Sequence, residues 1–273
     1  MPKNIRRVVS RQFGLARLAQ AGVVTGSLLA ATSGWAGDLD MPAAVEDAKL
    51  YFTAPLRWDK TDWTYFGGTL LAVVAAHEYD SDVRDNFADK SHAAAPGKDP
   101  NSMQQALPAA ALVAGTFVAS FFTDSHSGYQ ETWSMLEAGA LSSVTSLALK
   151  YAAGRARPND TADTNDWFNS GSSFPSLHTT AAFAIGTVLA ESGNDRYRWI
   201  RRLLGYGIAG GTAYLRMRDN VHWLSDTVAG AAIGVATAHF VMNRRAHSDS
   251  RVAMMVTPTE GGGMMLSWSM PLE

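Results

Sequence analysis

Four apolar-rich segments with helical spacing dominate the second half of the chain. They cover residues 131–154, 177–191, 197–217 and 222–242, and apolar positions recur in them every three to four residues. In an up-and-down bundle, each helix ends beside the start of the next one. We therefore predict an all-α fold in which the ends of these four helices share one face.

Two further apolar segments extend this bundle toward the N-terminus. Residues 62–79 and 102–123 read as helices, which brings the expected total to about six in a domain over residues 37–247. The charged segment Glu78 to Asp99 between them is interpreted as a solvated loop beside the opening of the site.

The pattern changes in the C-terminal extension, residues 248–273. Two short apolar runs, Val252 to Val256 and Met264 to Met270, flank Pro258 and the glycines of residues 261–263. Short apolar runs separated by turn residues are typical of paired strands. We predict a short β-hairpin here, for which the sequence gives no function.

The first 36 residues have the composition of an export signal. Basic residues precede an uncharged stretch from Leu18 to Ala36, which ends in Gly34-Trp35-Ala36, and small residues at these spacings favour cleavage. We predict a signal peptide over residues 1–36 and a periplasmic protein. An uncleaved anchor helix, with the protein in the inner membrane, is the alternative.

Charge and cysteine content exclude some classes of function. The formal net charge is −2, and cleavage after Ala36 would remove five basic residues and make it about −7. Such a surface is not expected to bind nucleic acid. The chain has no cysteine, which excludes disulfides and a thiol nucleophile. Its oligomeric state cannot be predicted from these features.

Cations, histidines and a hydroxyl gather at the four helix ends expected on one face. Two helix N-termini would add their unpaired N–H groups and partial positive charge to the same pocket. This combination predicts an anion-binding site, and phosphate is the anion that such donors commonly bind. The residues are Lys150, Arg157, Ser176, His178, Arg216, His222 and Asp226.

Three ordered motifs built from these residues resemble the signatures of the type 2 phosphatidic-acid phosphatase superfamily. They are Lys-x6-Arg-Pro from Lys150, Pro-Ser-x-His from Pro175 and Arg-x5-His-x3-Asp from Arg216. The superfamily also contains bacterial class A acid phosphatases and vanadium haloperoxidases. Leu177 stands where the family usually has glycine, and Leu215 where a serine usually precedes the arginine, and neither change removes a catalytic side chain.

The resemblance implies a role for each residue. His222 would be the nucleophile that forms a phosphohistidine, Asp226 would orient it, and His178 would be the general acid. A neutral His222 and a protonated His178 coexist best somewhat below neutral pH, although Asp226 favours a charged partner. The non-bridging oxygens of the phosphoryl group would be bound by Lys150, Arg157, Ser176, the Leu177 N–H and Arg216.

The loop from Arg157 to Pro175 is the best candidate for contacting the leaving group. Its aromatic residues, Trp167 and Phe168, could equally serve packing.

A metal site is the main competing interpretation of the pocket. His77 and His126 could join His222 and Asp226 as ligands. The three cations at the same place would repel a divalent ion. We expect no metal and no other cofactor.

Three functions follow. The first is a metal-independent phosphatase that hydrolyses soluble phosphomonoesters or pyrophosphates. The second is a lipid phosphatase or phosphotransferase at the membrane, acting on phosphatidic acid or prenyl pyrophosphate, and the third is a vanadium-dependent haloperoxidase. The mean hydropathy of −0.07 favours a soluble bundle, with membrane-surface contact as an option, because spanning helices usually hold about 20 apolar residues.

Overall fold

The structure is a computed structural model that describes residues 41–89, 91–99, 102–122, 125–192, 197–249, 253–258 and 264–269. The chain divides into two compact units, residues 1–46 and 47–273, and the features discussed below belong to the second. The predicted signal peptide, residues 1–36, lies outside the described residues.

The described part of the second unit and the residues just before it are largely helical. The elements are α2 (Met41–Thr53), the 3-10 helix η2 (Ala54–Arg57), α3 (Lys60–Glu78), α4 (Asp80–Phe87), α5 (Ser102–Ser120), α6 (Ser125–Ala153), α7 (Leu177–Glu191), α8 (Arg198–Arg218) and α9 (Leu224–Asp249). The all-α prediction is confirmed. About six helices was too few, because the described residues contain eight α-helices.

The prediction of a solvated loop over Glu78 to Asp99 was partly wrong. Residues 80–87 form α4, whose first turn carries Asp80 and Asp82, and acidic residues there favour the positive end of the helix dipole. The sequence of α4 is too polar for apolar periodicity to show a helix. Asp80 is fully buried, because it forms ion pairs inside the molecule.

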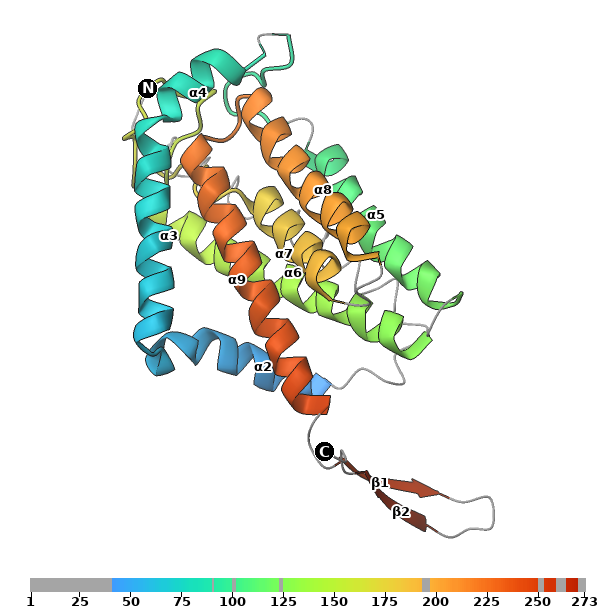
Figure 1. Ribbon diagram of the computed structural model, residues 1–273. Coiled ribbons are helices and arrows are strands. Elements are labelled where there is room, and N and C mark those ends of the chain that lie inside the picture. Colours follow the sequence, from blue (N-terminus) through green and yellow to red (C-terminus); the bar gives the residue numbers. More distant parts are fainter. Residues whose placement is uncertain are drawn as a thin grey trace, which may run out of the picture. The chain divides into compact units, whose positions relative to one another are not determined.

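Helix α7 lies at the centre of the bundle (Figure 1) and packs against α5, α6, α8 and α9. Its sequence, LHTTAAFAIGTVLAE, is apolar or small on every side, which is the pattern of a helix surrounded by others. The core around it is made of small and medium side chains, among them Met135, Ala138, Ala184, Val188, Ala238 and Val241.

Two glycines let α7 and α8 approach closely. A Cβ atom added to Gly186 would lie 2.4 Å from the Gly205 carbonyl oxygen, and one added to Gly205 would lie 2.2 Å from the Gly186 oxygen. Both distances are far below a van der Waals contact. The crossing point therefore requires glycine on both helices.

The bundle brings together the helix ends predicted to share one face. Hydrogen bonds link these ends: Ser176 N–H donates to the Asp226 carbonyl oxygen (3.0 Å) and joins the starts of α7 and α9. Lys150, near the end of α6, donates to the Pro175 carbonyl oxygen (2.8 Å) just before α7, so the predicted common face is present.

The predicted C-terminal hairpin is also present. Strands β1 (Ala253–Pro258) and β2 (Met264–Ser269) pair antiparallel, with Ala253 opposite Ser269 and Pro258 opposite Met264. The turn that joins them lies outside the described residues.

Candidate active site

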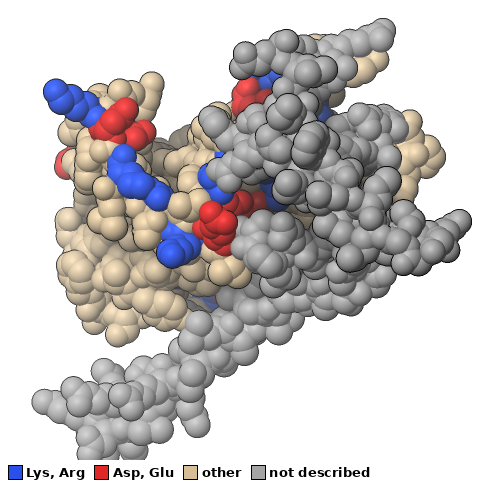
Figure 2. All heavy atoms as spheres, turned by 90° about the horizontal axis from the view of Figure 1, so that it is seen from below, with Lys and Arg blue, Asp and Glu red and all other residues tan. Residues whose placement is uncertain are grey.

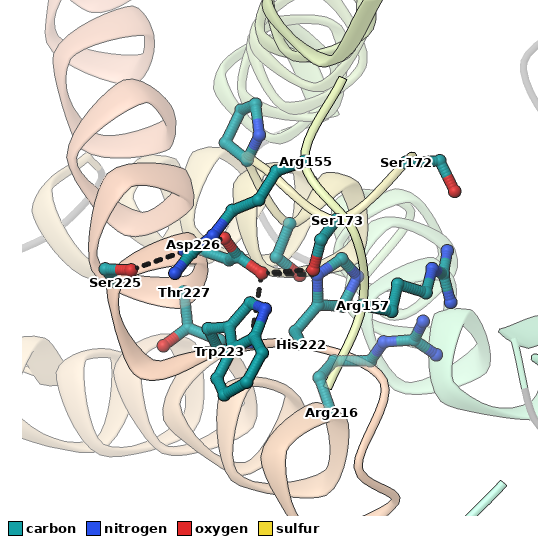
Figure 3. A network of polar contacts seen from close by, with 12 residues as sticks. Arg155, Arg157, Ser172, Ser173, Arg216, His222, Trp223, Ser225, Asp226 and Thr227 are labelled. Atoms are coloured by element: carbon teal, nitrogen blue, oxygen red, sulfur yellow. Dashed lines mark hydrogen bonds and ion pairs between the residues drawn. The ribbon is translucent and has the colours of Figure 1, made fainter. Parts of the chain in front are cut away.

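The Asp226 carboxylate is the centre of the polar network shown in Figure 3. Its Oδ1 accepts from Arg155 Nη1 (2.8 Å), and its Oδ2 accepts from Ser173 Oγ (2.5 Å) and Trp223 N–H (2.9 Å). The bond to Trp223 closes the first turn of α9, as an acidic residue at the third helical position often does. Asp226 is thus fixed on both oxygens.

His222 lies in the turn before α9 and is almost completely buried. Its Nδ1 is 3.4 Å from Asp226 Oδ2, which is long for a hydrogen bond. The predicted partnership is therefore present, but its contact is longer than the other three that Asp226 makes. Burial, together with the positive charges of Arg216, Arg157 and Lys150, holds the pKa of His222 well below its usual value, so the ring is neutral at neutral pH.

Arg155 is a residue that the sequence analysis missed. It is fully buried and bridges two carboxylates, Asp226 and Asp80, the latter through Nη2 at 2.7 Å. Asp80 in turn accepts from Ser225 N–H (2.8 Å) and Ser225 Oγ (2.7 Å). A buried arginine between two carboxylates is well compensated, whereas removing one partner would leave charge unpaired.

Two neighbouring rings complete the surroundings of Arg155. Its guanidinium lies 4.4 Å from the ring centre of Trp167, at a distance typical of a cation–π contact. His77 Nδ1 lies 2.9 Å from Asp80 and 3.0 Å from Arg155. His77, considered above as a metal ligand, therefore belongs to this network.

No local sequence pattern singles out Arg155 or Asp80. Asp80 looks like one more acid in a charged segment, and Arg155 lies inside the variable spacing between Lys150 and Arg157. Arg155 and Asp80 form their ion pair although 75 residues of chain separate them. Only the folded structure therefore shows that they belong to the site.

Lys150 reaches the site from α6, but its ammonium group is used differently from the expectation. It donates to the carbonyl oxygens of Ser172 (2.6 Å), Ser173 (3.0 Å) and Pro175 (2.8 Å), which accounts for all three of its N–H donors. Lys150 thus fixes the segment before α7. Burial and the nearby charge of Arg157 lower the pKa of Lys150 to about 7, so it is only partly charged at neutral pH. In this structure its N–H groups point at the protein backbone.

Arg157 and Arg216 are joined by a carboxylate that the sequence analysis assigned to a loop. Asp99 Oδ1 accepts from Arg216 Nη1 (2.9 Å), and Oδ2 accepts from Arg216 Nη2 (2.6 Å) and Arg157 Nη1 (2.8 Å). Burial opposes ionisation of Asp99, but these hydrogen bonds and the two positive charges hold its pKa far below the usual range. Asp99 is therefore charged at all ordinary pH values.

The N-terminus of α7 supplies the remaining expected residues. Ser176 is the N-cap residue and is fully buried, but its side chain makes no capping hydrogen bond. Its Oγ instead accepts from Thr179 Oγ1 at 3.0 Å. Leu177 and His178 follow in the first turn and are partly buried.

The aromatic residues of the loop from Arg157 to Pro175 differ in exposure. Trp167 packs on Arg155 and on Phe174, whose ring centre is 5.4 Å away, while Phe168 is 83% exposed. Contact with a leaving group stays a prediction.

The described residues contain no group of three or more His, Asp or Glu side chains placed to hold a metal ion. His126, the other histidine considered as a ligand, has a side chain outside the described part.

Residues 131–248 match the family model of the PAP2 superfamily. This segment belongs to the PAP2 superfamily. It contains all three motifs between Lys150 and Asp226 as well as Arg155. Asp80 and Asp99 precede the PAP2 segment, so two carboxylates that bind the arginines of the site come from outside it.

Among known proteins, the lipid A 1-phosphatase of Porphyromonas gingivalis is 38% identical over 86 residues, which is 32% of this chain and 17% of that protein. The match thus spans about a sixth of the relative's length. LpxE of Aquifex aeolicus is 21% identical with a TM-score of 0.35, over 54% of this chain and 88% of that one. A transmembrane PAP2 type phosphatidylglycerolphosphate phosphatase from Bacillus subtilis is 16% identical with a TM-score of 0.39, over 84% and 96%.

Proposed function

We propose that this protein is a phosphatase that removes a phosphate group from a membrane lipid, with His222 as the nucleophile. The observation that carries the chemistry is a buried, neutral histidine beside the guanidinium groups of Arg157 and Arg216. Neutral imidazole can attack phosphorus, and fixed guanidinium groups stabilise the charge that spreads over the phosphoryl oxygens. Membership of the PAP2 superfamily supports the same reaction.

The proposed mechanism assigns one role to each of these side chains. His222 would form the N–P bond while the ester P–O bond breaks, and His178 at the start of α7 would protonate the departing oxygen. Water, deprotonated by His178, would then attack the phosphohistidine and release phosphate. Asp226, held by Arg155 and Ser173, would keep the attacking nitrogen of His222 free of its proton.

The lipid part of the proposal comes from the outer faces of the helices. On α3, residues 63–76 are uncharged, and this helix exposes large apolar side chains along its length, including Leu71 at 72% and Val74 at 59%. α8 exposes Trp199 at 68% and Leu203 at 65%. Soluble proteins rarely expose continuous apolar surfaces of this kind.

Figure 2, a view from below, shows that residues other than Lys, Arg, Asp and Glu make up most of the described surface on that face. α3 and α5 have 19 residues each, or about 28 Å of helix, which is close to the thickness of a bilayer core. Among the described helices, α9 alone is long and apolar enough to cross a membrane, over Leu224–Ala246, and half of that stretch is buried. These faces favour the membrane alternative over the soluble bundle expected from mean hydropathy.

We place the site on the periplasmic side, because residues 1–36 predict export. Under this proposal the substrate is a lipid-borne phosphate monoester, the class to which the substrate named for the Porphyromonas gingivalis relative belongs. The proposal requires no metal, since the guanidinium groups of Arg157 and Arg216 supply fixed positive charge.

The test uses the full chain in detergent with three substrates: a lipid phosphate monoester in mixed micelles, a soluble aryl phosphate, and halide with peroxide and vanadate. We expect lipid phosphate to be hydrolysed best, with activity retained in a chelator. His222→Ala should lower kcat by at least about 10³-fold. His92→Ala, which removes an exposed histidine paired with Asp89, is the matched control and should stay active.

Phosphorylated enzyme should be trapped by an alkaline quench and lost in acid, because phosphohistidine is acid-labile. If the soluble ester were hydrolysed best, the protein would be a phosphatase of soluble substrates. If halide were oxidised and no phosphate released, the protein would be a haloperoxidase. Activity lost in a chelator and restored by a divalent ion would overturn the metal-free mechanism.

A further inference from the structure

Asp99 occupies the donors that a phosphoryl group would need. Its carboxylate accepts three hydrogen bonds from two arginines, with distances between 2.6 and 2.9 Å. Carboxylate and phosphate bind a guanidinium through the same planar pair of N–H donors. The site of this protein therefore already contains an anion of its own.

The position of Asp99 is fixed by the segment that carries it. Asn159 Nδ2 donates to the carbonyl oxygens of Ala95 (3.0 Å) and Lys98 (3.1 Å), and Gly97 N–H donates to Asp160 Oδ1 (2.6 Å). This segment is thus bound to the residues that follow Arg157. Asp99 is 23% exposed whereas Arg216 is fully buried, so the carboxylate lies toward solvent from this arginine.

Part of each guanidinium remains available. The Nε atoms of Arg157 and Arg216 are buried and have no hydrogen-bond partner in the part of the chain that the structure describes. Asp99 binds Arg216 through the two terminal nitrogens, which leaves the edge that contains Nε. A phosphoryl group must either take this edge, beside the negative charge of Asp99, or displace the carboxylate.

We propose that Asp99 is an internal anion that competes with the phosphoryl group for Arg157 and Arg216, and so sets how tightly the site holds phosphate. The proposal rests on the proposed function in taking these arginines as phosphate ligands. Its consequence is weak retention of the phosphate product, because each released phosphate is replaced by a carboxylate that is already in place.

A purely structural role for Asp99 predicts the opposite sign. If Asp99 served only to hold the two arginines in position, its removal would let them move and would weaken phosphate binding. If it competes, its removal frees three N–H donors and deletes a like charge, and phosphate binds more tightly. The affinity for inorganic phosphate separates the two roles.

The experiment measures the Kd for inorganic phosphate by calorimetry on the full chain in detergent, without substrate. Asp99→Asn and Asp99→Ala should each bind phosphate about 10- to 100-fold more tightly than the unaltered protein, the range expected for removing one negative charge about 5 Å away in a partly buried site. Asp99→Glu keeps the charge and should keep weak binding.

Asp160→Asn is the matched control. It removes a negative charge from the same loop but keeps an Oδ1 acceptor for Gly97 N–H, so the segment that carries Asp99 stays in place. The Kd should change less than about two-fold, because an exposed charge is screened by salt. The Asn and Ala variants at position 99 test the same effect independently, so either suffices if the other does not fold.

Unchanged or weaker phosphate binding in the Asn and Ala variants would overturn the proposal, as would an equal gain in Asp160→Asn or the absence of phosphate binding in every variant. Tighter phosphate binding without any lipid phosphate turnover would retain this proposal while the proposed function failed.

Discussion

Arg155 determines how Asp226 is held, and through Asp226 it acts on His222. It donates to Ser225 Oγ (2.8 Å), Asp226 (2.8 Å), Asp80 (2.7 Å) and the Thr164 carbonyl oxygen (2.8 Å). Residues that orient metal ligands commonly change activity by about 10- to 100-fold when replaced, and we expect a similar effect here. Under the proposed function, Arg155 is a positioning residue that acts on His222 through Asp226.

Arg155→Lys should keep the charge but lose the planar fork. We expect kcat to fall about 10- to 100-fold, while the Kd for inorganic phosphate stays within about three-fold, because Arg155 bonds to carboxylates rather than to substrate. Arg155→Ala should cost about 3–5 kcal/mol of stability, since it leaves two buried carboxylates unpaired. Kinetics with phosphate titration and thermal unfolding measure the two effects. A parallel loss of phosphate affinity in the lysine variant would contradict a positioning role.

The lowered pKa of His222 predicts the acidic limb of the pH profile. His222 must be neutral to attack, and its pKa lies well below 6.5. The acidic limb of kcat/KM should therefore fall below pH 6.5. The unfolded chain binds this proton more readily than the folded one, so stability should decrease as pH falls from about 6.5 toward the folded pKa. If activity instead began to fall at or above pH 6.5, and a substitution at another residue removed that fall, the acidic limb would belong to that other residue.

Helix α7 is the element on which the site depends most. Its N-terminus carries Ser176 and His178, and its middle is fixed by the glycine contact with α8. Gly230 of α9 also leaves no room for a side chain, because an added Cβ would lie 2.8 Å from the Ser176 carbonyl oxygen. The helices that carry the motifs are therefore placed by backbone contacts within the bundle.

Gly205→Ala should place a methyl group 2.2 Å from the Gly186 carbonyl oxygen and force α7 and α8 apart. We expect a loss of about 1–3 kcal/mol and reduced activity, because the start of α7 would shift. Gly207→Ala is the matched control on the same helix: nothing lies within 4 Å of its added Cβ, and alanine favours the helix by up to about 1 kcal/mol. Thermal unfolding in detergent measures both, and equal stability of the two variants would refute the close contact.

At the scale of the whole molecule, α3, α5 and α8 each expose large apolar side chains, such as Leu71, Leu107 and Leu203, and under the proposed function these would contact a lipid bilayer. Burying apolar surface in lipid is favourable, while the backbone of each helix satisfies its own hydrogen bonds. The site would then lie at one end of the helices, where a lipid phosphate can reach it from the membrane surface.

The full chain should therefore remain in the membrane fraction after high salt and alkaline carbonate, and detergent should release it in active form. Release by high salt alone would indicate a peripheral protein, because salt screens charge contacts but leaves apolar burial intact. Fractionation followed by immunoblotting measures the distribution.

Helical periodicity and the three motifs determined the all-α fold, the common end of four helices and the residues from Lys150 to Asp226, because both kinds of information are local in sequence. Neither periodicity nor motifs could predict that α3 exposes its apolar side chains or that Asp80 is buried. Whether a charged residue is solvated or paired depends on partners that are distant in the chain: Asp99 meets Arg216 across 117 residues.

Only the tertiary structure shows that Arg155 pairs with Asp226, that Lys150 donates to the backbone before α7, and that Asp99 pairs with Arg157 and Arg216. Each of these follows from packing, because close approach of the helices removes water and leaves a buried charge to pair with the nearest opposite charge. The sequence determined which groups were present for the chemistry, and packing decided which of them bind one another.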